Sequence, residues 1–119
     1  MPCPDPIHPN LARGRWGERL AASWYEAHGY DVVARNWRCS FGELDLIVGR
    51  GRRLVVVEVK ARRTDAFGPP ASAVGPAKQQ RIRRLAAEWL ATSDVSGVEI
   101  RFDVVAVTGA NVEVYEDAF

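Results

Sequence analysis

Two short segments, residues 42–48 and 54–60, constrain the fold of this 119-residue chain more than any other part of it. Both alternate in polarity and are rich in Val, Leu and Ile, as β-strands are. The polar turn between them, residues 49–53, contains two glycines, so the simplest structure is a β-hairpin. A four-residue turn from Arg50 to Arg53 would pair Gly49 with Leu54.

This register places Asp45 directly opposite Glu58. Paired residues lie on one face of a sheet, with their Cβ atoms about 4.5–5.5 Å apart, and a slip of one residue would separate them. Two facing carboxylates are destabilising unless a cation lies between them or one of them is protonated. Lys60 projects beside them, two residues along the strand. Such a group suits a divalent metal ion that acts on a phosphodiester.

A solvated strand is the alternative interpretation. Glu-x-Lys in a strand is common, and alone it more often marks a solvated face than a catalytic site. The combination of Gly-Glu-x-Asp at residues 42–45 with Glu-x-Lys at residues 58–60 is much more specific.

Strict alternation along the first of these strands also predicts that Leu44, Leu46 and Val48 share the face of the sheet away from Asp45.

The combined pattern resembles the YraN family of small bacterial predicted nucleases, within the PD-(D/E)XK superfamily. That superfamily has a restriction-endonuclease-like fold, with an Asp and a Glu-x-Lys on adjacent strands. The resemblance extends from about Arg13 to the end of the chain and is carried by Gly17-Glu18, Arg35-Asn36, residues 42–47 and 57–60, Arg62, Phe67-Gly68, Lys78, residues 101–103 and Ala118-Phe119. It implies that Asp45, Glu58, Lys60 and Glu18 are catalytic, and that Asp45, Glu58 and Glu18 bind Mg²⁺ or Mn²⁺.

The first predicted helix, residues 11–28, has two neighbouring stripes. One stripe recurs every four residues and is expected to face the core: Trp16, Leu20 and Trp24. The other consists of small residues, which let a helix backbone approach a sheet closely: Gly14, Gly17 and Ala21. Glu18 lies at the edge of the small strip, either as an ordinary surface glutamate or within reach of Asp45. The resemblance favours the second.

The remaining elements complete an α/β fold. Strands are predicted at residues 30–36, 98–107 and 111–116, and Pro76 suits the first position of a helix that ends near Thr92. That helix connects Lys60 to Val98, so their two strands can be parallel through a right-handed crossover. The first three strands can form an antiparallel meander. The order αβββαββ, a mixed sheet flanked by helices, agrees with the restriction-endonuclease-like fold.

Four charged residues are assigned to support the site. Lys78 shares the buried stripe of the second predicted helix, where it either reaches the carboxylates or extends past the apolar face into water. Asp103 lies in the middle of a core strand and needs a partner. Arg62, Lys78 or backbone donors could serve, so its role is supporting or structural. Glu43 and Arg62 complete the set.

Length and composition predict one soluble domain. With 47% hydrophobic and 26% charged residues, residues 10–119 are expected to form a single nuclease-like domain. Residues 1–9, which contain four prolines, are expected to be a flexible tail. Two cysteines without Cys-x-x-Cys spacing suggest neither zinc nor a disulfide. The absence of a long apolar run or a secretory signal predicts a cytoplasmic protein without a membrane partner.

The leading hypothesis is a metal-dependent endonuclease that hydrolyses DNA phosphodiester bonds. Structured or branched DNA is favoured only by analogy with the Holliday-junction resolvases of the superfamily, and such two-fold substrates would favour a homodimer. The net charge of +1 excludes a basic nucleic-acid coat, but arginine clusters can contact phosphates. Arg62, Arg63 and Arg81 are assigned to that contact; simple solvation is the alternative. The rival functions are nucleic-acid binding with weak or no turnover, and a small interaction protein.

Overall fold

The computed structural model describes residues 9–62 and 74–119. Its elements follow the order α1 (Pro9–Ala27), β1 (Asp31–Cys39), β2 (Gly42–Arg50), β3 (Arg53–Arg62), α2 (Pro76–Thr92), β4 (Glu99–Thr108) and β5 (Asn111–Tyr115). The predicted order αβββαββ is therefore confirmed. The predicted tail lies outside the described residues except for Pro9, at which α1 begins. β1 is longer than predicted, because it continues through Trp37 to Cys39.

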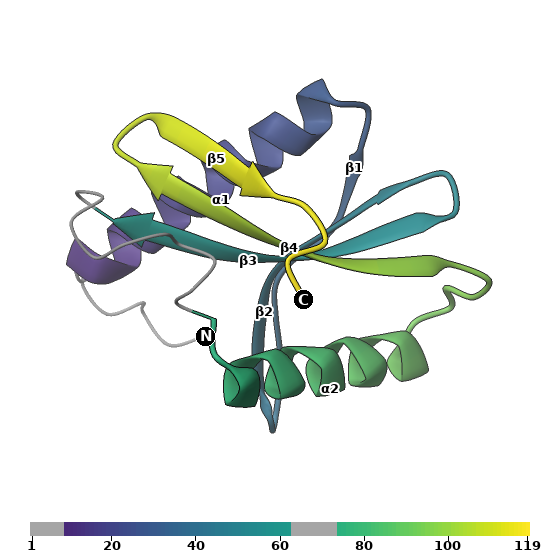
Figure 1. The fold of residues 1–119 in the computed structure, drawn as a ribbon. Helices are drawn as coiled ribbons and strands as arrows, with labels where there is room; N and C mark the ends of the chain where they lie inside the picture. The colour runs from purple at the N-terminus through teal and green to yellow at the C-terminus, as the bar shows by residue number, and fades with distance from the viewer. Residues whose placement is uncertain (1–8, 63–73) are drawn as a thin grey trace, which may run out of the picture.

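Within the described residues the strands form one sheet in the order β1-β2-β3-β4-β5. β3 and β4 are parallel, and every other neighbouring pair is antiparallel. This confirms both the meander and the crossover through α2. The two helices cover opposite faces of the sheet, each over its own apolar cluster (Figure 1). Neither helix in this part of the chain is long and apolar enough to cross a membrane.

The hairpin formed by β2 and β3 separates before its far end. Gly49 pairs with Leu54, which confirms the predicted register, but Arg50 also pairs with Arg53, so the turn has two residues and not the predicted four. The pairs continue as far as Leu46 with Val57, one short of the predicted pair of Asp45 with Glu58. β1 and β2, in contrast, stay paired to the end of the strands, where Cys39 lies opposite Gly42. β2 therefore leaves β3 at Asp45 while it remains attached to β1.

A change of face accompanies this separation. Leu44 packs in the cluster beneath α2, whereas Leu46 packs in the cluster beneath α1. The prediction that strict alternation holds from Leu44 to Val48 is therefore wrong at Leu44. The backbone of the neighbouring strand β1 is irregular at the same place. Asn36, which lies between the residues paired with Leu46 and Leu44, has a positive φ of 49°. Both strands bend here, and their common end curves toward α2 (Figure 1).

Gly17 and Ala21 of the small strip lie on the buried face of α1. A Cβ added to Gly17 would lie 2.9 Å from the Cβ of Ala61 on β3, so the helix backbone rests almost directly on the sheet. Ala21 is fully buried, whereas 48% of Trp16 is exposed. The prediction that Trp16 faces the core is therefore wrong, because a close helix-to-sheet approach leaves no room for an indole. Leu20 and Trp24 of the same stripe are partly buried.

Gly17→Ala is expected to lower the free energy of unfolding by about 1–3 kcal/mol, since overpacking a tight contact costs that much. Gly14→Ala is the matched control, because a Cβ there meets nothing within 4 Å. Both changes add the same helix propensity, so Gly14→Ala should be neutral or stabilising by up to about 1 kcal/mol. Urea unfolding of the two variants measures the difference. Equal effects would show that the close approach at Gly17 is absent.

Candidate active site

A pocket of about 220 Å³ lies where β2 separates from β3 and is covered by the start of α2. Its lining combines charged and apolar side chains with one glycine: Gly42, Glu43, Asp45, Glu58, Lys78, Arg81, Ile82 and Leu85. The structure thus brings Asp45 and Glu58 into one cavity. It does so although the backbones no longer pair there, because the side chain of Asp45 fills the gap that the separating strands leave.

Asp45 replaces the missing backbone contact with its carboxylate. The backbone N–H of Val59 donates a hydrogen bond of 2.9 Å to its Oδ2 atom. Burial, together with the negative charge of Glu58, raises the pKa of Asp45 to about 7. Two carboxylates in this position cannot both be ionised cheaply without a cation. The pair therefore holds either a proton or a positive charge at neutral pH.

Glu58 is nearly buried, with 8% of its surface exposed, and two lysines approach the same oxygen. The Nζ atom of Lys78 lies 2.7 Å from Oε1, and that of Lys60 lies 3.7 Å from it. Burial and the neighbouring Lys78 lower the pKa of Lys60. Burial opposes the charge of Lys78 as well, but its contacts with Glu58, Lys60 and Asp45 outweigh that effect and raise its pKa. Of the two alternatives for Lys78, the structure selects the contact with the carboxylates.

Glu18 lies near this pair without joining it. Burial raises its pKa and a side-chain hydrogen bond with Asn36 opposes the rise, while the charge of Glu43 adds to it. Glu43 itself is paired with Arg38, whose Nε lies 3.1 Å from its Oε2. Among residues 9–62 and 74–119, no three His, Cys, Asp or Glu side chains are grouped as a set of metal ligands. Asp45 and Glu58 are therefore a pair, and Glu18 is a neighbour that acts on Asp45 through its charge.

The chemistry of this donor pair nevertheless fits a hard divalent cation. Mg²⁺ is commonly held by one or two carboxylates, with water and substrate phosphate completing its shell. Burial and the charge of Glu58 raise the pKa of Asp45, and a divalent ion bound between the two carboxylates would favour the ionised form of both. A preformed cage of three or more protein ligands is not required for this kind of site.

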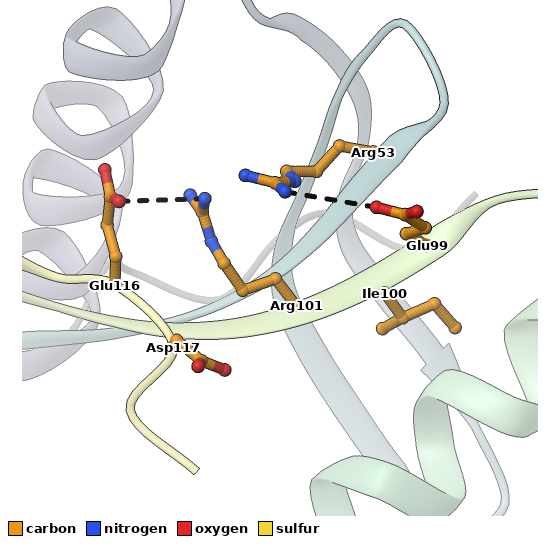
Figure 2. Close-up of a pocket in the computed structure, with 6 residues that line it drawn as sticks. All are labelled: Arg53, Glu99, Ile100, Arg101, Glu116 and Asp117. Atoms are coloured by element: carbon orange, nitrogen blue, oxygen red, sulfur yellow. Dashed lines mark ion pairs between the residues drawn. The ribbon is translucent and has the colours of Figure 1, made fainter.

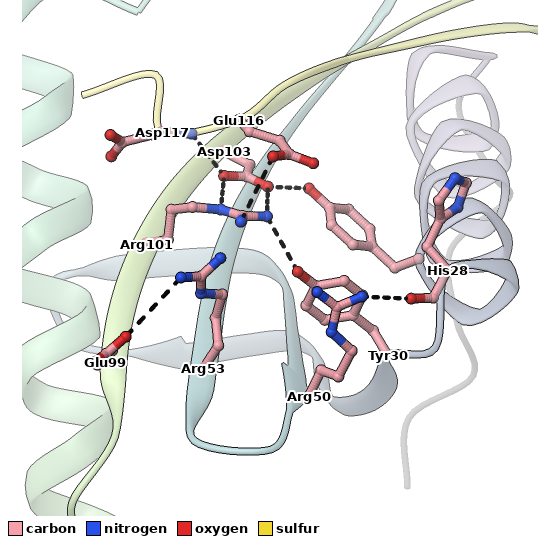
Figure 3. Close-up of polar contacts among 10 residues, drawn as sticks. His28, Tyr30, Arg50, Arg53, Glu99, Arg101, Asp103, Glu116 and Asp117 are labelled. Atoms are coloured by element: carbon pink, nitrogen blue, oxygen red, sulfur yellow. Dashed lines mark hydrogen bonds and ion pairs between the residues drawn. The ribbon is translucent and has the colours of Figure 1, made fainter.

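Asp103 belongs to a different part of the molecule. It pairs with Val57 on the face covered by α1, whereas Glu58 faces α2. The side chain is fully buried and accepts hydrogen bonds from Tyr25 Oη at 2.6 Å, Arg101 Nε at 2.8 Å and the Asp117 backbone N–H at 3.0 Å. Figure 3 shows this network joining β4 to the C-terminal segment. Of its two predicted roles, supporting or structural, these contacts favour the structural one.

The three arginines that were predicted to contact phosphates differ in where they lie. Arg81 lines the pocket on an exposed turn of α2, and Arg62 ends β3, half-buried. Arg63 lies outside the described residues. Sequence reasoning missed Asn36 as a site neighbour. Two features of the sequence could have indicated Asn36. It belongs to the Arg35-Asn36 pair that carries the resemblance described above, and Asn is among the residues that tolerate a positive φ.

A second, larger cavity lies at the other end of the sheet, but its chemistry is less suited to catalysis. It has a volume of about 380 Å³ and is lined by Arg53, Glu99, Ile100, Arg101, Glu116 and Asp117 (Figure 2). Its two arginines are each paired with an acid across the cavity wall, at 3.9 and 3.7 Å. These charges compensate one another, so the smaller pocket with its opposed carboxylates is the better candidate.

Comparison with known proteins places the whole pocket inside one family. The sequence model described as "Uncharacterised protein family UPF0102" matches residues 17–107. The chain belongs to the UPF0102 family. The UPF0102 protein of Beutenbergia cavernae is 56% identical over 96 residues, which is 81% of each chain. That of Syntrophus aciditrophicus is 45% identical over 114 residues, or 92% of this chain and 90% of the relative.

The UPF0102 match includes each residue of the candidate site. It begins at Gly17, the glycine that seats α1 on the sheet, and it ends at Val107 near the end of β4. Glu18, Asp45, Glu58, Lys60 and Lys78 all lie within it. The region that matches the UPF0102 family therefore contains every residue that lines the pocket.

Proposed function

We propose that this UPF0102 protein is a metal-dependent endonuclease that hydrolyses DNA phosphodiester bonds. The supporting observation is the pairing of Asp45 with Glu58 in one pocket, with two lysines on Glu58. The same types of residue, on adjacent strands, characterise the YraN nucleases and the PD-(D/E)XK superfamily that the sequence resembles. The role of the metal and the choice of DNA as substrate are parts of this proposal.

In this proposal Asp45 and Glu58 hold Mg²⁺ or Mn²⁺. When bound, the ion supplies a water of lowered pKa and neutralises charge on the attacked phosphate. The ammonium of Lys60 stabilises the negative charge that develops on the phosphate. Arg81, which is exposed at the pocket, binds a neighbouring phosphate. Ile82 and Leu85 supply the apolar wall that limits access of bulk water.

One observation favours nucleic-acid binding with weak or no turnover as the second candidate. Lys78 lies 2.7 Å from Glu58, so a protein cation already compensates this carboxylate. A site that is satisfied in this way can persist as a basic binding surface without catalysis. In the nuclease proposal Lys78 instead shares Glu58 with the ion and orients the carboxylate toward it.

Incubation with four DNA forms separates the two candidates. Single-stranded, duplex, flapped and four-way-junction DNA are each mixed with the full chain in Mg²⁺, in Mn²⁺ or in a chelator. We expect cleavage of at least one form with metal and none with the chelator. Binding without cleavage would favour the second candidate, and cleavage in the chelator would contradict the metal mechanism.

Lys60→Ala is expected to lower the cleavage rate by about 10²-fold or more, as loss of one transition-state contact does. Metal and DNA affinity should stay within about tenfold, because a protonated lysine is no metal ligand. Lys60→Arg should restore activity only in part, since a planar fork cannot place a point charge at the same position. Arg52→Ala, at the far end of the hairpin, is the control. If Lys60→Ala cuts DNA at the parent rate, Lys60 has no catalytic role.

A further inference from the structure

An exposed aromatic residue is next along the chain to one that lines the pocket. Phe41 lies in the turn between β1 and β2, and 43% of it is exposed. The next residue along the chain, Gly42, lines the pocket, so the two Cα atoms are only about 3.8 Å apart. The turn that carries the ring thus adjoins the cavity that holds Asp45 and Glu58.

An arginine from the other wall of the pocket covers one face of this ring. The guanidinium carbon of Arg84 lies 3.8 Å from the ring centroid of Phe41. Arg84 follows the pocket-lining Arg81 by three residues on α2, so both project on neighbouring parts of the same helix surface. The pair therefore bridges the two elements between which the pocket opens.

The turn that carries Phe41 packs against α2. A Cβ added to Gly42 would lie 3.5 Å from Cδ1 of Leu85, and its φ of +143° is one that favours glycine. The backbone N–H of Phe41 donates to the Sγ atom of Cys39 at 3.4 Å. The turn therefore rests on α2, the helix that also carries Arg84.

A flat ring and a guanidinium beside a phosphodiester pocket suit an unpaired base. Bases that are free of a duplex stack on aromatic side chains and on arginine planes, whatever their identity. Bases inside a duplex are already stacked on one another and present only their edges. We propose that Phe41 and Arg84 form a stacking platform for an unpaired base next to the bound phosphate. The substrate is then DNA with a single-stranded segment at the cleavage point.

This inference rests on the proposed function, and its test is separable from that of cleavage. Affinity is measured in a chelator, so that no strand is cut, on forked DNA and on a blunt duplex of the same length. Three substitutions at Phe41 are compared with the parent. Phe41→Leu keeps apolar bulk without a ring, Phe41→Ala removes both, and Phe41→Trp enlarges the ring. Ile100→Ala is the control, because Ile100 is a similarly exposed apolar residue (38%) at the other cavity.

Loss of the ring is expected to weaken binding of forked DNA by about tenfold, as loss of one base–aromatic stack does. The Leu and Ala variants should show this loss alike, the Trp and Ile100→Ala variants should bind like the parent, and duplex affinity should change less than about twofold in all of them. If Phe41→Leu binds forked DNA like the parent, or if duplex affinity falls equally, the stacking platform is overturned while the nuclease proposal stands. If the parent binds neither DNA, both proposals fail.

Discussion

Asp45→Asn is expected to reduce metal-dependent DNA cleavage by at least about 10³-fold, at the upper end of what removal of one strong electrostatic contact costs. Metal affinity should fall with it, because an amide oxygen is a weaker ligand for a hard cation than a carboxylate. The substitution should not disturb the fold. An Asn oxygen can still accept the hydrogen bond from Val59 that Asp45 accepts at 2.9 Å.

The same variant should be more stable than the parent at high pH. Burial and Glu58 raise the pKa of Asp45 from 3.8 to about 7. Between these values the folded state binds the proton and the unfolded state does not, so stability falls as pH rises through this window. Asn carries no charge and avoids this cost, which is on the order of 4 kcal/mol.

Urea unfolding at two pH values, paired with the cleavage assay, checks this prediction. At pH 8 Asp45→Asn should exceed the parent in stability, and below about pH 4, the unfolded-state pKa, the difference should disappear. Glu99→Gln, a change at an exposed carboxylate on the other end of the sheet, should alter neither activity nor stability. A loss of cleavage together with a loss of stability would indicate misfolding and would contradict the assignment of Asp45.

Asp103→Ala is expected to lower the free energy of unfolding by about 3–5 kcal/mol, the usual effect of removing one partner of a buried ion pair. Arg101, with 12% of its side chain exposed, would keep its charge without the carboxylate that binds its Nε and Nη2 atoms. Tyr25 would lose the acceptor of its hydroxyl proton. The free energy of unfolding of a typical domain is about 5–15 kcal/mol in total, so the variant should be only marginally folded.

Urea unfolding measures this loss. The control is Asp94→Ala, at an exposed aspartate, which should change the free energy of unfolding by less than about 0.5 kcal/mol. Because Asp103 lies on the face away from the pocket, cleavage per folded molecule should be unchanged at low temperature. A small stability loss combined with a large activity loss would show that Asp103 supports the active site and would contradict the structural role.

Local signals in the sequence were sufficient for the arrangement of the sheet. The glycine-containing polar turn between β2 and β3 indicated the pairing of Gly49 with Leu54, although the turn itself is shorter than predicted. Pro76 marks the start of α2, as expected from its fixed φ. The helix between β3 and β4 allowed the parallel pairing that the structure has. Each of these inferences depends on the pattern within one segment or on the type of element that connects two strands.

Features that depend on tertiary packing were not accessible in this way. The face change at Leu44 requires the common bend of β1 and β2, which no period-2 pattern contains. The exposure of Trp16 follows from how closely Gly17 approaches Ala61. For Asp103, the sequence indicated the need for a partner but could not identify Tyr25, 78 residues away along the chain.

Titration of the full chain with Mn²⁺, followed by electron paramagnetic resonance of the free ion, measures whether Asp45 and Glu58 together bind a divalent cation. We expect about one Mn²⁺ per chain, bound weakly because two carboxylates and water make an open site. Asp45→Asn and Glu58→Gln should each abolish this binding, and Glu99→Gln should retain it. Binding that survives both site substitutions, or no binding by the parent, would show that these two carboxylates do not hold a divalent cation.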